Sequence, residues 1–124
     1  MVAEKTTDGR RLAQLLASEL TGRQVPPFDR VTVENADTDA EPTPDGTRAY
    51  DIELDGERAG AVYMQPDRLY VDLRRGRADA RTAAADAGLR VRPVASKPPR
   101  TLVFVADAAE VKRVVDVLAA ALGE

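Results

Sequence analysis

The sequence predicts an α+β domain with a mainly antiparallel sheet of about six strands and three helices, in the order α-β-β-β-β-α-β-β-α. Strand-like segments follow one another in hairpins instead of alternating with helices. The dipeptide Asp55-Gly56 separates two such segments, and it is typical of a two-residue hairpin because both central residues of a type I′ turn need positive φ. The length of 124 residues suits one domain, so we expect a single domain over residues 1–124, with the helices covering one face of the sheet.

The first helix is expected over about Thr7–Leu20. Thr6, Thr7 or Asp8 can cap its start. Its leucines recur at helical spacing and form one apolar stripe: Leu12, Leu15, Leu16 and Leu20. Thr21-Gly22 is expected to end the helix, and Pro26-Pro27 prevents its continuation.

A short strand and an acidic loop are expected next. Val31 and Val33 alternate with polar residues, a pattern typical of a half-buried strand. Residues 36–47, ADTDAEPTPDGT, are polar and acidic and contain two prolines. We expect this segment to be a mobile loop inside the domain, because neither flank is long enough to fold alone.

A three-stranded meander is expected around the Asp55-Gly56 turn, with a second turn at Pro66-Asp67. Within each strand the apolar residues alternate with other residues: Tyr50, Ile52 and Leu54 share one face of the first strand, Val62 and Met64 share one face of the second, and Leu69, Val71 and Leu73 share one face of the third. The residues between them are Asp51 and Glu53 in the first strand, Ala61 and Tyr63 in the second, and Tyr70, Asp72 and Arg74 in the third. This alternation favours a sheet with one buried face.

The second helix is expected over about Arg77–Ala87, with Gly88 just past its end. Its inner stripe consists of small residues: Ala80, Ala83, Ala84 and Ala87. Small side chains bury little area, but they let a helix backbone lie close to its neighbour.

Two strands and a third helix complete the chain. Leu89, Val91 and Pro93 are expected in one strand, and residues 101–105, TLVFV, are apolar on both faces, as in an interior strand. Asp107 and Glu110 have the spacing of a capping box at the start of the last helix. The core stripe of that helix consists of Val111, Val114, Val115, Leu118 and Leu122, and Gly123 follows it.

The composition excludes several classes of chemistry. The chain has no Cys and no His, so disulfides, the usual zinc sites and Ser-His or Cys-His pairs are excluded. Ser18 and Ser96 do not lie in a nucleophile motif, and Lys97 lies in a proline-rich loop where it would stay hydrated. The carboxylates do not follow calcium-loop spacing. We therefore expect no enzyme activity, cofactor or metal site, and no membrane partner because no apolar run approaches ~20 residues.

Charge is distributed unevenly along the chain. Residues 29–67 carry three Arg and eleven Asp or Glu, whereas residues 68–100 carry nine Lys or Arg and three Asp. The clustered carboxylates, Asp51, Glu53, Asp55 and Glu57, are expected to form a solvated acidic face. An acidic block followed by a basic block is the most informative feature of the sequence.

The basic block is the candidate binding segment. Arg74, Arg75, Arg77 and Arg81 surround the start of the second helix. A helix N-terminus favours anions, so this group predicts an anion or phosphate site. The alternative is that these arginines pair with the protein's own carboxylates, Asp51, Glu53 and Asp72. Gly76 stands alone and matches no phosphate-loop motif.

A second group of cations follows the second helix: Arg90, Arg92, Lys97 and Arg100. If the two strands that flank the Lys-Pro-Pro-Arg loop pair, these cations gather at one rim, presented by rigid prolines. RNA binding would need aromatic side chains between the cations. Tyr63 and Tyr70 are the aromatic residues considered for that role, and both can also serve cross-strand packing. Nucleic acid is therefore a possible partner and not the favoured one.

The sequence resembles a group of small uncharacterised proteins of halophilic archaea. The resemblance is carried by LYVDLRRGRADARTAAADAGLRVRPVASKPPRTLVFV and the downstream AAEVKRVVDVLAAAL, and it covers most of the chain from Tyr50 onward. It implies an α+β fold, a cytoplasmic haloarchaeal setting and no assigned activity. It implies no catalytic residue.

The sequence thus favours a non-enzymatic cytoplasmic domain that binds another macromolecule or itself. Its acidic and basic blocks could meet between copies in a homo-oligomer, and a free sheet edge could pair with a second chain. The alternative is an anion-binding or RNA-binding module that uses the basic segment 68–100.

Overall fold

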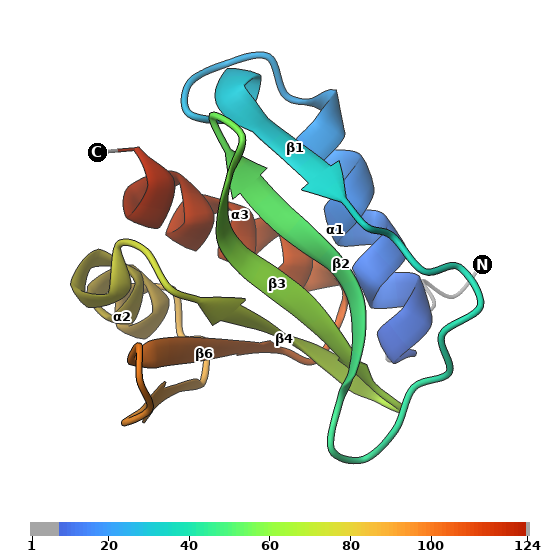
Figure 1. The fold of residues 1–124 in the computed structure, drawn as a ribbon. Helices are drawn as coiled ribbons and strands as arrows, with labels where there is room; N and C mark the ends of the chain where they lie inside the picture. The colour runs from blue at the N-terminus through green and yellow to red at the C-terminus, as the bar shows by residue number, and fades with distance from the viewer. Residues whose placement is uncertain (1–7, 124) are drawn as a thin grey trace, which may run out of the picture.

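The computed structural model describes residues 8–123. In that part of the chain, three helices and six strands follow the predicted order (Figure 1). The elements are α1 (Gly9–Gly22), η1 (Phe28–Arg30), β1 (Val31–Glu34), β2 (Thr47–Leu54), β3 (Glu57–Gln65), β4 (Arg68–Leu73), α2 (Arg77–Asp86), β5 (Val91–Val94), β6 (Arg100–Val105) and α3 (Ala108–Leu122). The predicted α+β class is confirmed, and the short 3₁₀ helix η1 is an addition to it.

All six strands form one antiparallel sheet in the order β1-β2-β3-β4-β6-β5. The predicted hairpin turn is present between β2 and β3, where Asp55 and Gly56 have φ of 54° and 82°. The β6 strand lies between β4 and β5, so its interior position is as predicted from the apolar residues on both faces. The edges of the sheet are β1 and β5.

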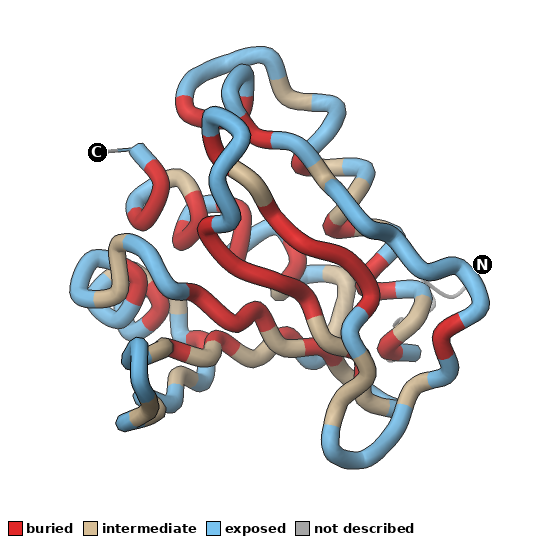
Figure 2. The backbone as a smooth tube through the Cα atoms, in the orientation of Figure 1, coloured by how far each residue is buried: buried red, intermediate tan, exposed pale blue. Residues whose placement is uncertain are grey.

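The helices pack on one face of the sheet and leave the other face open (Figure 1). The α3 helix contacts both α1 and α2, and all three helices contact strands. Buried residues of the helices meet the apolar face of the meander, and the buried backbone runs through β2, β3 and β4 (Figure 2). The largest fully buried side chains are Leu12, Leu16, Leu20, Ile52, Leu54, Leu69, Leu73, Leu118, Leu122, Val62, Val71 and Val103. Within residues 8–123, no helix is long and apolar enough to cross a membrane.

The α1 helix begins and ends later than the leucine spacing suggested. Asp8 caps it, and its carboxylate accepts hydrogen bonds from the backbone N–H groups of Arg10 and Arg11 at 2.9 and 3.2 Å. The alternative caps Thr6 and Thr7 lie outside the described residues. The helix continues through Gly22, and the Thr21 hydroxyl donates to the Ala17 carbonyl at 2.9 Å.

The later elements match their predicted signals with small shifts. The α2 helix ends at Asp86, one residue early, and Gly88 follows with φ of 74°. Leu89 is buried ahead of β5 instead of lying in it. At the start of α3, the Asp107 carboxylate accepts from the Glu110 N–H at 3.0 Å, as predicted. The Glu110 carboxylate accepts in return from the Ala106 N–H at 2.8 Å.

Candidate functional site

A row of aromatic side chains crosses the open face of the sheet. The register places Tyr63 of β3 opposite Tyr70 of β4, and Tyr70 opposite Phe104 of β6. Arg48 of β2 pairs with Tyr63 at one end of the row. At the other end, the Phe104 N–H donates to the Arg90 carbonyl at 2.8 Å. The open face thus carries three aromatic residues in line between two arginine positions.

The three rings contact one another. The Tyr63 and Tyr70 rings are stacked, with centroids 5.1 Å apart and planes 8° from parallel. The Phe104 ring is tilted by 48° to Tyr70 at 5.5 Å. The Tyr70 hydroxyl donates to the Asp45 carbonyl at 3.2 Å, and burial, followed by the nearby Tyr63, raises the pKa of Tyr70. These contacts hold the central ring in one position.

A carboxylate lies beside the row on β2, and it is buried instead of solvated. Asp51 is 2% exposed, so the prediction of a solvated acidic face is wrong at this position. Its carboxylate accepts from the Asn35 amide at 2.8 Å and forms ion pairs with Arg48 at 3.5 Å and Arg58 at 3.7 Å. The reason is that Asp51 lies on a strand paired on both sides and its carboxylate is contacted by Asn35, Arg48 and Arg58, which offset the cost of burying the charge.

The second buried carboxylate of this face belongs to Asp72 on β4. The Arg100 guanidinium donates to it at 2.5 Å, with side-chain exposures of 35% for Arg100 and 7% for Asp72. Burial raises the pKa of Asp72, while the positive charges of Arg100, Arg74 and Arg58 act in the opposite direction. Two buried carboxylates, of Asp51 and Asp72, therefore lie on the open face beside the aromatic row, and their ion-pair partners are Arg48, Arg58 and Arg100.

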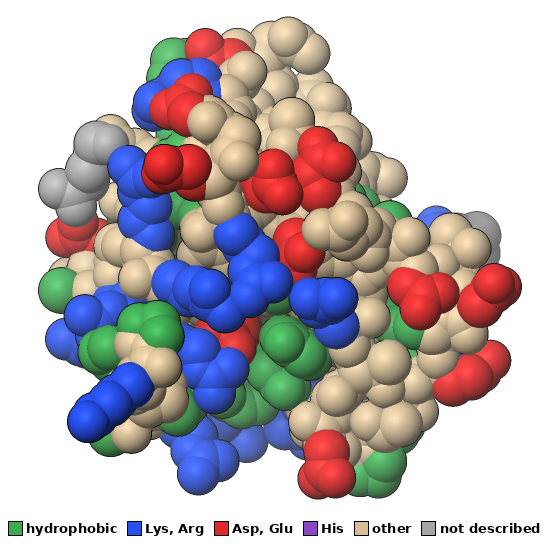
Figure 3. Space-filling view, in the orientation of Figure 1, with side chains coloured by type: hydrophobic (Ala, Val, Ile, Leu, Met, Phe, Trp, Pro, Cys, Tyr) green, Lys and Arg blue, Asp and Glu red, His purple; other side chains and the backbone are tan. Residues whose placement is uncertain are grey.

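Figure 3 views this open face directly. Basic side chains gather over the middle of the face, next to an apolar patch, and acidic side chains lie mainly along the upper and right-hand margins. Chemically, the arrangement offers ring surfaces for stacking and guanidinium groups for anions.

The predicted basic residues divide between two parts of the molecule. Arg92 pairs with Leu102 and Arg100 with Val94 in the β5–β6 ladder, and Arg74 donates its backbone N–H to Ala59 of β3. Arg90, Arg92, Arg100 and Arg74 therefore belong to the open face or its border. Arg77 and Arg81 lie on α2, on the helical side, whereas Arg75 and Lys97 lie in loops.

The second cation group does not form one rim. The strands that flank the Lys-Pro-Pro-Arg loop do pair, as the hypothesis required. The antiparallel register places Arg90 near the far end of the hairpin from Lys97. The cations therefore extend along the hairpin and do not gather at its loop.

The last turn of α3 packs against the start of α2. A Cβ on Gly76 would lie 2.0 Å from the carbonyl oxygen of Ala121, so the last turn of α3 packs directly against this helix end. A carbonyl oxygen complements the positive end of the α2 dipole. The alternative interpretation, that the arginines around this helix start pair with Asp51, Glu53 and Asp72, is supported for Arg74, whose positive charge opposes the rise that burial causes in the pKa of Asp72. The ion pair of Asp72 is formed by Arg100, which belongs to the second cation group.

Three site residues were missed from the sequence. Phe104 looked like one more apolar residue of an interior strand, and Arg48 and Arg58 lie inside the acidic block. Only the strand order places these residues beside the tyrosines, because β6 must pair with β4 for Phe104 to reach Tyr70. Strand order was not predictable from local pattern alone.

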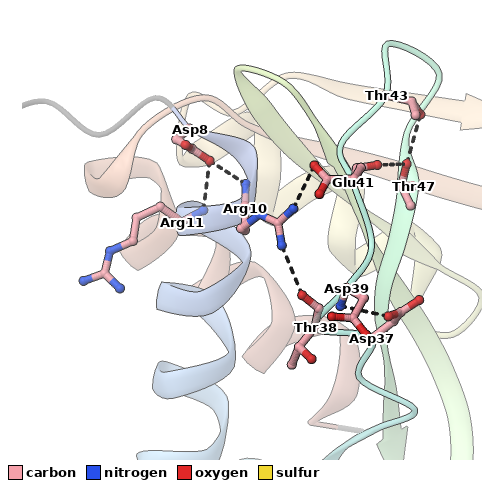
Figure 4. Close-up of polar contacts among 9 residues, drawn as sticks. All are labelled: Asp8, Arg10, Arg11, Asp37, Thr38, Asp39, Glu41, Thr43 and Thr47. Carbon is pink, nitrogen blue, oxygen red and sulfur yellow. Dashed lines mark hydrogen bonds and ion pairs between the residues drawn. The ribbon is translucent and has the colours of Figure 1, made fainter.

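The acidic loop is attached to α1 by Arg10 (Figure 4). Its guanidinium donates to the Thr38 carbonyl at 3.2 Å and pairs with the Glu41 carboxylate at 3.1 Å. On the other side, the Thr47 hydroxyl donates to the Glu41 carbonyl at 2.6 Å. Among residues 8–123, no group of three or more carboxylates is placed to hold a metal ion.

The fold and this face define a small α+β protein with a one-sided antiparallel sheet and an exposed basic and aromatic surface. The chain belongs to a family of unknown function (DUF7993), whose family model matches residues 1–124. Neither a search of curated proteins nor a search of solved structures found a protein that matches the chain.

Proposed function

We propose that the protein is a non-enzymatic domain that binds single-stranded RNA on the open face of its sheet. The observation that carries this proposal is the row in which Tyr63, Tyr70 and Phe104 lie between Arg48 and Arg90. Proteins bind single strands by stacking bases on aromatic rings while cations follow the phosphates.

In this proposal, RNA bases stack on the rings at the two ends of the row. Tyr70 contacts both neighbouring rings, so Tyr63 and Phe104 each have one side turned away from it. A base that stacks on the outer side of either ring extends the row and comes close to Arg48 or Arg90. Stacking at each end is worth about 1–3 kcal/mol per base.

The arginines beside the row supply the electrostatic attraction for the phosphates of the RNA. Arg92 is exposed on β5, and none of the ion pairs formed within residues 8–123 includes it. Arg58 and Arg100 already neutralise the buried Asp51 and Asp72, so these carboxylates repel a polyanion less.

Self-association through the sheet edges has weaker support. The edge strand β5 contains Pro93, which has no N–H to donate, and Arg92 is exposed on it. The other edge, β1, has only four residues. Short edges with proline and charge oppose pairing with a second sheet.

The cytoplasmic and haloarchaeal setting is part of this proposal. It is supported by 13 Asp against 8 Glu and by 15 Arg against 3 Lys, a composition that suits a salt-rich cytoplasm. In such a setting stacking matters more than phosphate contacts, because salt screens charge.

The test is fluorescence anisotropy of a labelled mixed-sequence RNA of about 12 nucleotides, titrated with the protein over a salt series. We expect Phe104→Ala to weaken binding at least about fivefold, from the loss of one stacked base. We expect Arg48→Gln to weaken binding and to make the salt dependence shallower by about 0.7 in log–log slope, one phosphate contact.

The matched control is Arg81→Gln, which removes the same charge from α2 on the helical side. It should leave affinity within about twofold. Absence of binding at low salt would overturn the proposal, as would equal losses for Arg81→Gln and Arg48→Gln. Circular dichroism of each variant verifies that it is folded.

A further inference from the structure

A polar hollow of about 230 Å³ lies at the Phe104 end of the aromatic row. It is lined by Arg68, Gly88, Arg90, Phe104, Ala106 and Glu110. These residues come from the start of β4, the two ends of the segment between α2 and β5, the end of β6 and the first turn of α3. The hollow therefore continues the open face around the end of the sheet toward the helices.

The charged residues that line this hollow are Arg68, Arg90 and Glu110. Arg68 forms an ion pair with Asp67 at 3.5 Å, and Asp67 is 70% exposed, so an anion can replace this contact at little cost. Arg90 takes part in none of the ion pairs formed by residues 8–123. One oxygen of Glu110, Oε1, accepts from the Ala106 N–H, and this bond fixes the carboxylate in place.

The three kinds of group match the three parts of a ribonucleotide. A guanidinium pair suits a phosphate, an aromatic ring suits a base, and a carboxylate oxygen accepts from a sugar hydroxyl. We propose that this hollow binds one ribonucleotide unit, with its phosphate at Arg68 and Arg90, its base on Phe104 and its 2′-hydroxyl donating to Glu110. This inference rests on the proposed function and adds to it a preference for RNA over DNA.

The size of the hollow agrees with a subsite and not with a complete ligand pocket. Pockets that enclose a drug-sized ligand have volumes of about 300–1,000 Å³. A hollow of about 230 Å³ has room for a phosphate and a sugar edge, and the base would then lie on the open face beside Phe104. The positive φ of Gly88, 74°, and the open space around it keep this wall free of a side chain.

The test compares three labelled strands of one sequence, oligocytidine as RNA, as DNA and as 2′-O-methyl RNA. We expect the wild type to bind RNA about three- to tenfold more tightly than the other two, since both lack the 2′-hydroxyl donor and one hydrogen bond is lost. Equal affinities for RNA and DNA would overturn this inference and leave the proposed function intact. Absence of binding to all three would overturn both.

Substitutions in the hollow test whether it causes the preference for RNA over DNA. Glu110→Ala should bring the RNA and DNA affinities within about twofold of each other, because it removes the acceptor. The control Glu57→Ala removes an exposed carboxylate from the β2–β3 hairpin, and it should keep the preference. Arg90→Gln should weaken RNA and DNA alike. A preference for RNA that survives Glu110→Ala in a folded variant overturns the assignment.

A competition experiment shows whether the hollow binds free nucleotides as well as nucleotide units within an RNA strand. Cytidine 5′-monophosphate and its 2′-deoxy form are added as competitors of the labelled RNA. Competition by the ribonucleotide alone assigns the hollow to free nucleotides as well as strands, and it supports the proposal. An RNA preference without competition assigns the hollow to strands alone and also supports it. Equal competition by the two nucleotides contradicts it.

Discussion

Tyr63 and Tyr70 stack face to face across the β3–β4 ladder, with ring centroids 5.1 Å apart and planes 8° from parallel. The two residues are direct partners in the register, so the backbone already places their side chains side by side. Phe104 on β6 then meets the opposite side of Tyr70. The three rings are therefore already ordered by their contacts with one another, which would lower the entropic cost of the proposed RNA binding.

The stack predicts a measurable coupling between its two tyrosines. Replacing Tyr63, Tyr70 or both by Leu in a double-mutant cycle should give a coupling of about 0.5–1.5 kcal/mol in the free energy of unfolding, because stacked rings contribute beyond their buried area. Urea denaturation measures it. The control cycle pairs Tyr63→Leu with Val25→Ala, at a residue 60% exposed, and should be additive. A coupling of zero in the first cycle would show that the stacking of the two rings contributes no interaction energy to stability.

A second prediction concerns Gly46, which lies against the Tyr70 ring. Its φ is 99°, and a Cβ there would lie 2.6 Å from the Tyr70 hydroxyl oxygen. Gly46→Ala should destabilise the fold by about 1–3 kcal/mol and shift the Tyr70 ring resonances, because both the backbone and the ring must move. Urea denaturation and NMR of the tyrosine rings measure these effects.

The matched control is Gly22→Ala at the end of α1, where the added Cβ has no atom within 4 Å apart from its chain neighbours and the adjacent backbone of its own helix. This substitution should stabilise the protein by up to about 1 kcal/mol, because alanine has the higher helix propensity. The prediction for Gly46 is wrong if the two variants change stability in the same direction.

The third prediction concerns the clamp that Arg10 forms on the acidic loop (Figure 4). Arg10→Gln removes the ion pair with Glu41 and weakens the contact with the Thr38 carbonyl. Amide hydrogen exchange in residues 37–45 should become faster, while the free energy of unfolding changes by less than about 1 kcal/mol, because the pair is exposed. Exchange measured by mass spectrometry or NMR tests this.

Arg11 supplies the control for the clamp. Its guanidinium contacts Gln14 of the same helix at 3.3 Å, so Arg11→Gln removes an equal charge without touching the loop. Exchange in the loop should then stay at the wild-type rate. Unchanged exchange in Arg10→Gln would mean that the contacts of Thr47 hold the loop without Arg10.

The fold was predictable because its local signals agree with one another. Alternating apolar residues predicted the meander, and Asp55-Gly56 predicted its turn. Asp107 and Glu110 predicted the start of α3. Each of these signals involves residues only a few positions apart, and residues that close in sequence are also close in space.

The candidate site was only partly predictable because it depends on long-range pairing. Tyr63 and Tyr70 were considered from the sequence, but Phe104 joins them only through the β4–β6 register. Asp51 was expected to be solvated, and its burial follows from the place of β2 between β1 and β3 and from the Asn35, Arg48 and Arg58 side chains that contact its carboxylate. Charge counts along the chain cannot show which arginine reaches which carboxylate, as Arg100 and Asp72 do across 28 residues.

The last prediction is a pH dependence that arises from Asp72. Burial raises its pKa, and the guanidinium groups that face it, Arg100 of β6, Arg74 after β4 and Arg58 of β3, only partly offset this effect. As the pH falls, the folded protein therefore takes up this proton before the unfolded chain does. The contribution of Asp72 to stability is fully present below the unfolded-state pKa, and it is lost as the pH rises through the folded-state pKa.

Asp72→Asn removes this titration while keeping the shape of the side chain. The free energy of unfolding of the wild type, relative to this variant, should rise as the pH is lowered from about 7 to about 4. Urea denaturation at a series of pH values measures the difference, and Asp116→Asn, which removes an exposed carboxyl from α3, is measured in parallel. A wild-type advantage over Asp72→Asn that shrinks toward acid would mean that the Arg100 ion pair, and not burial, dominates the protonation of Asp72 in the folded state.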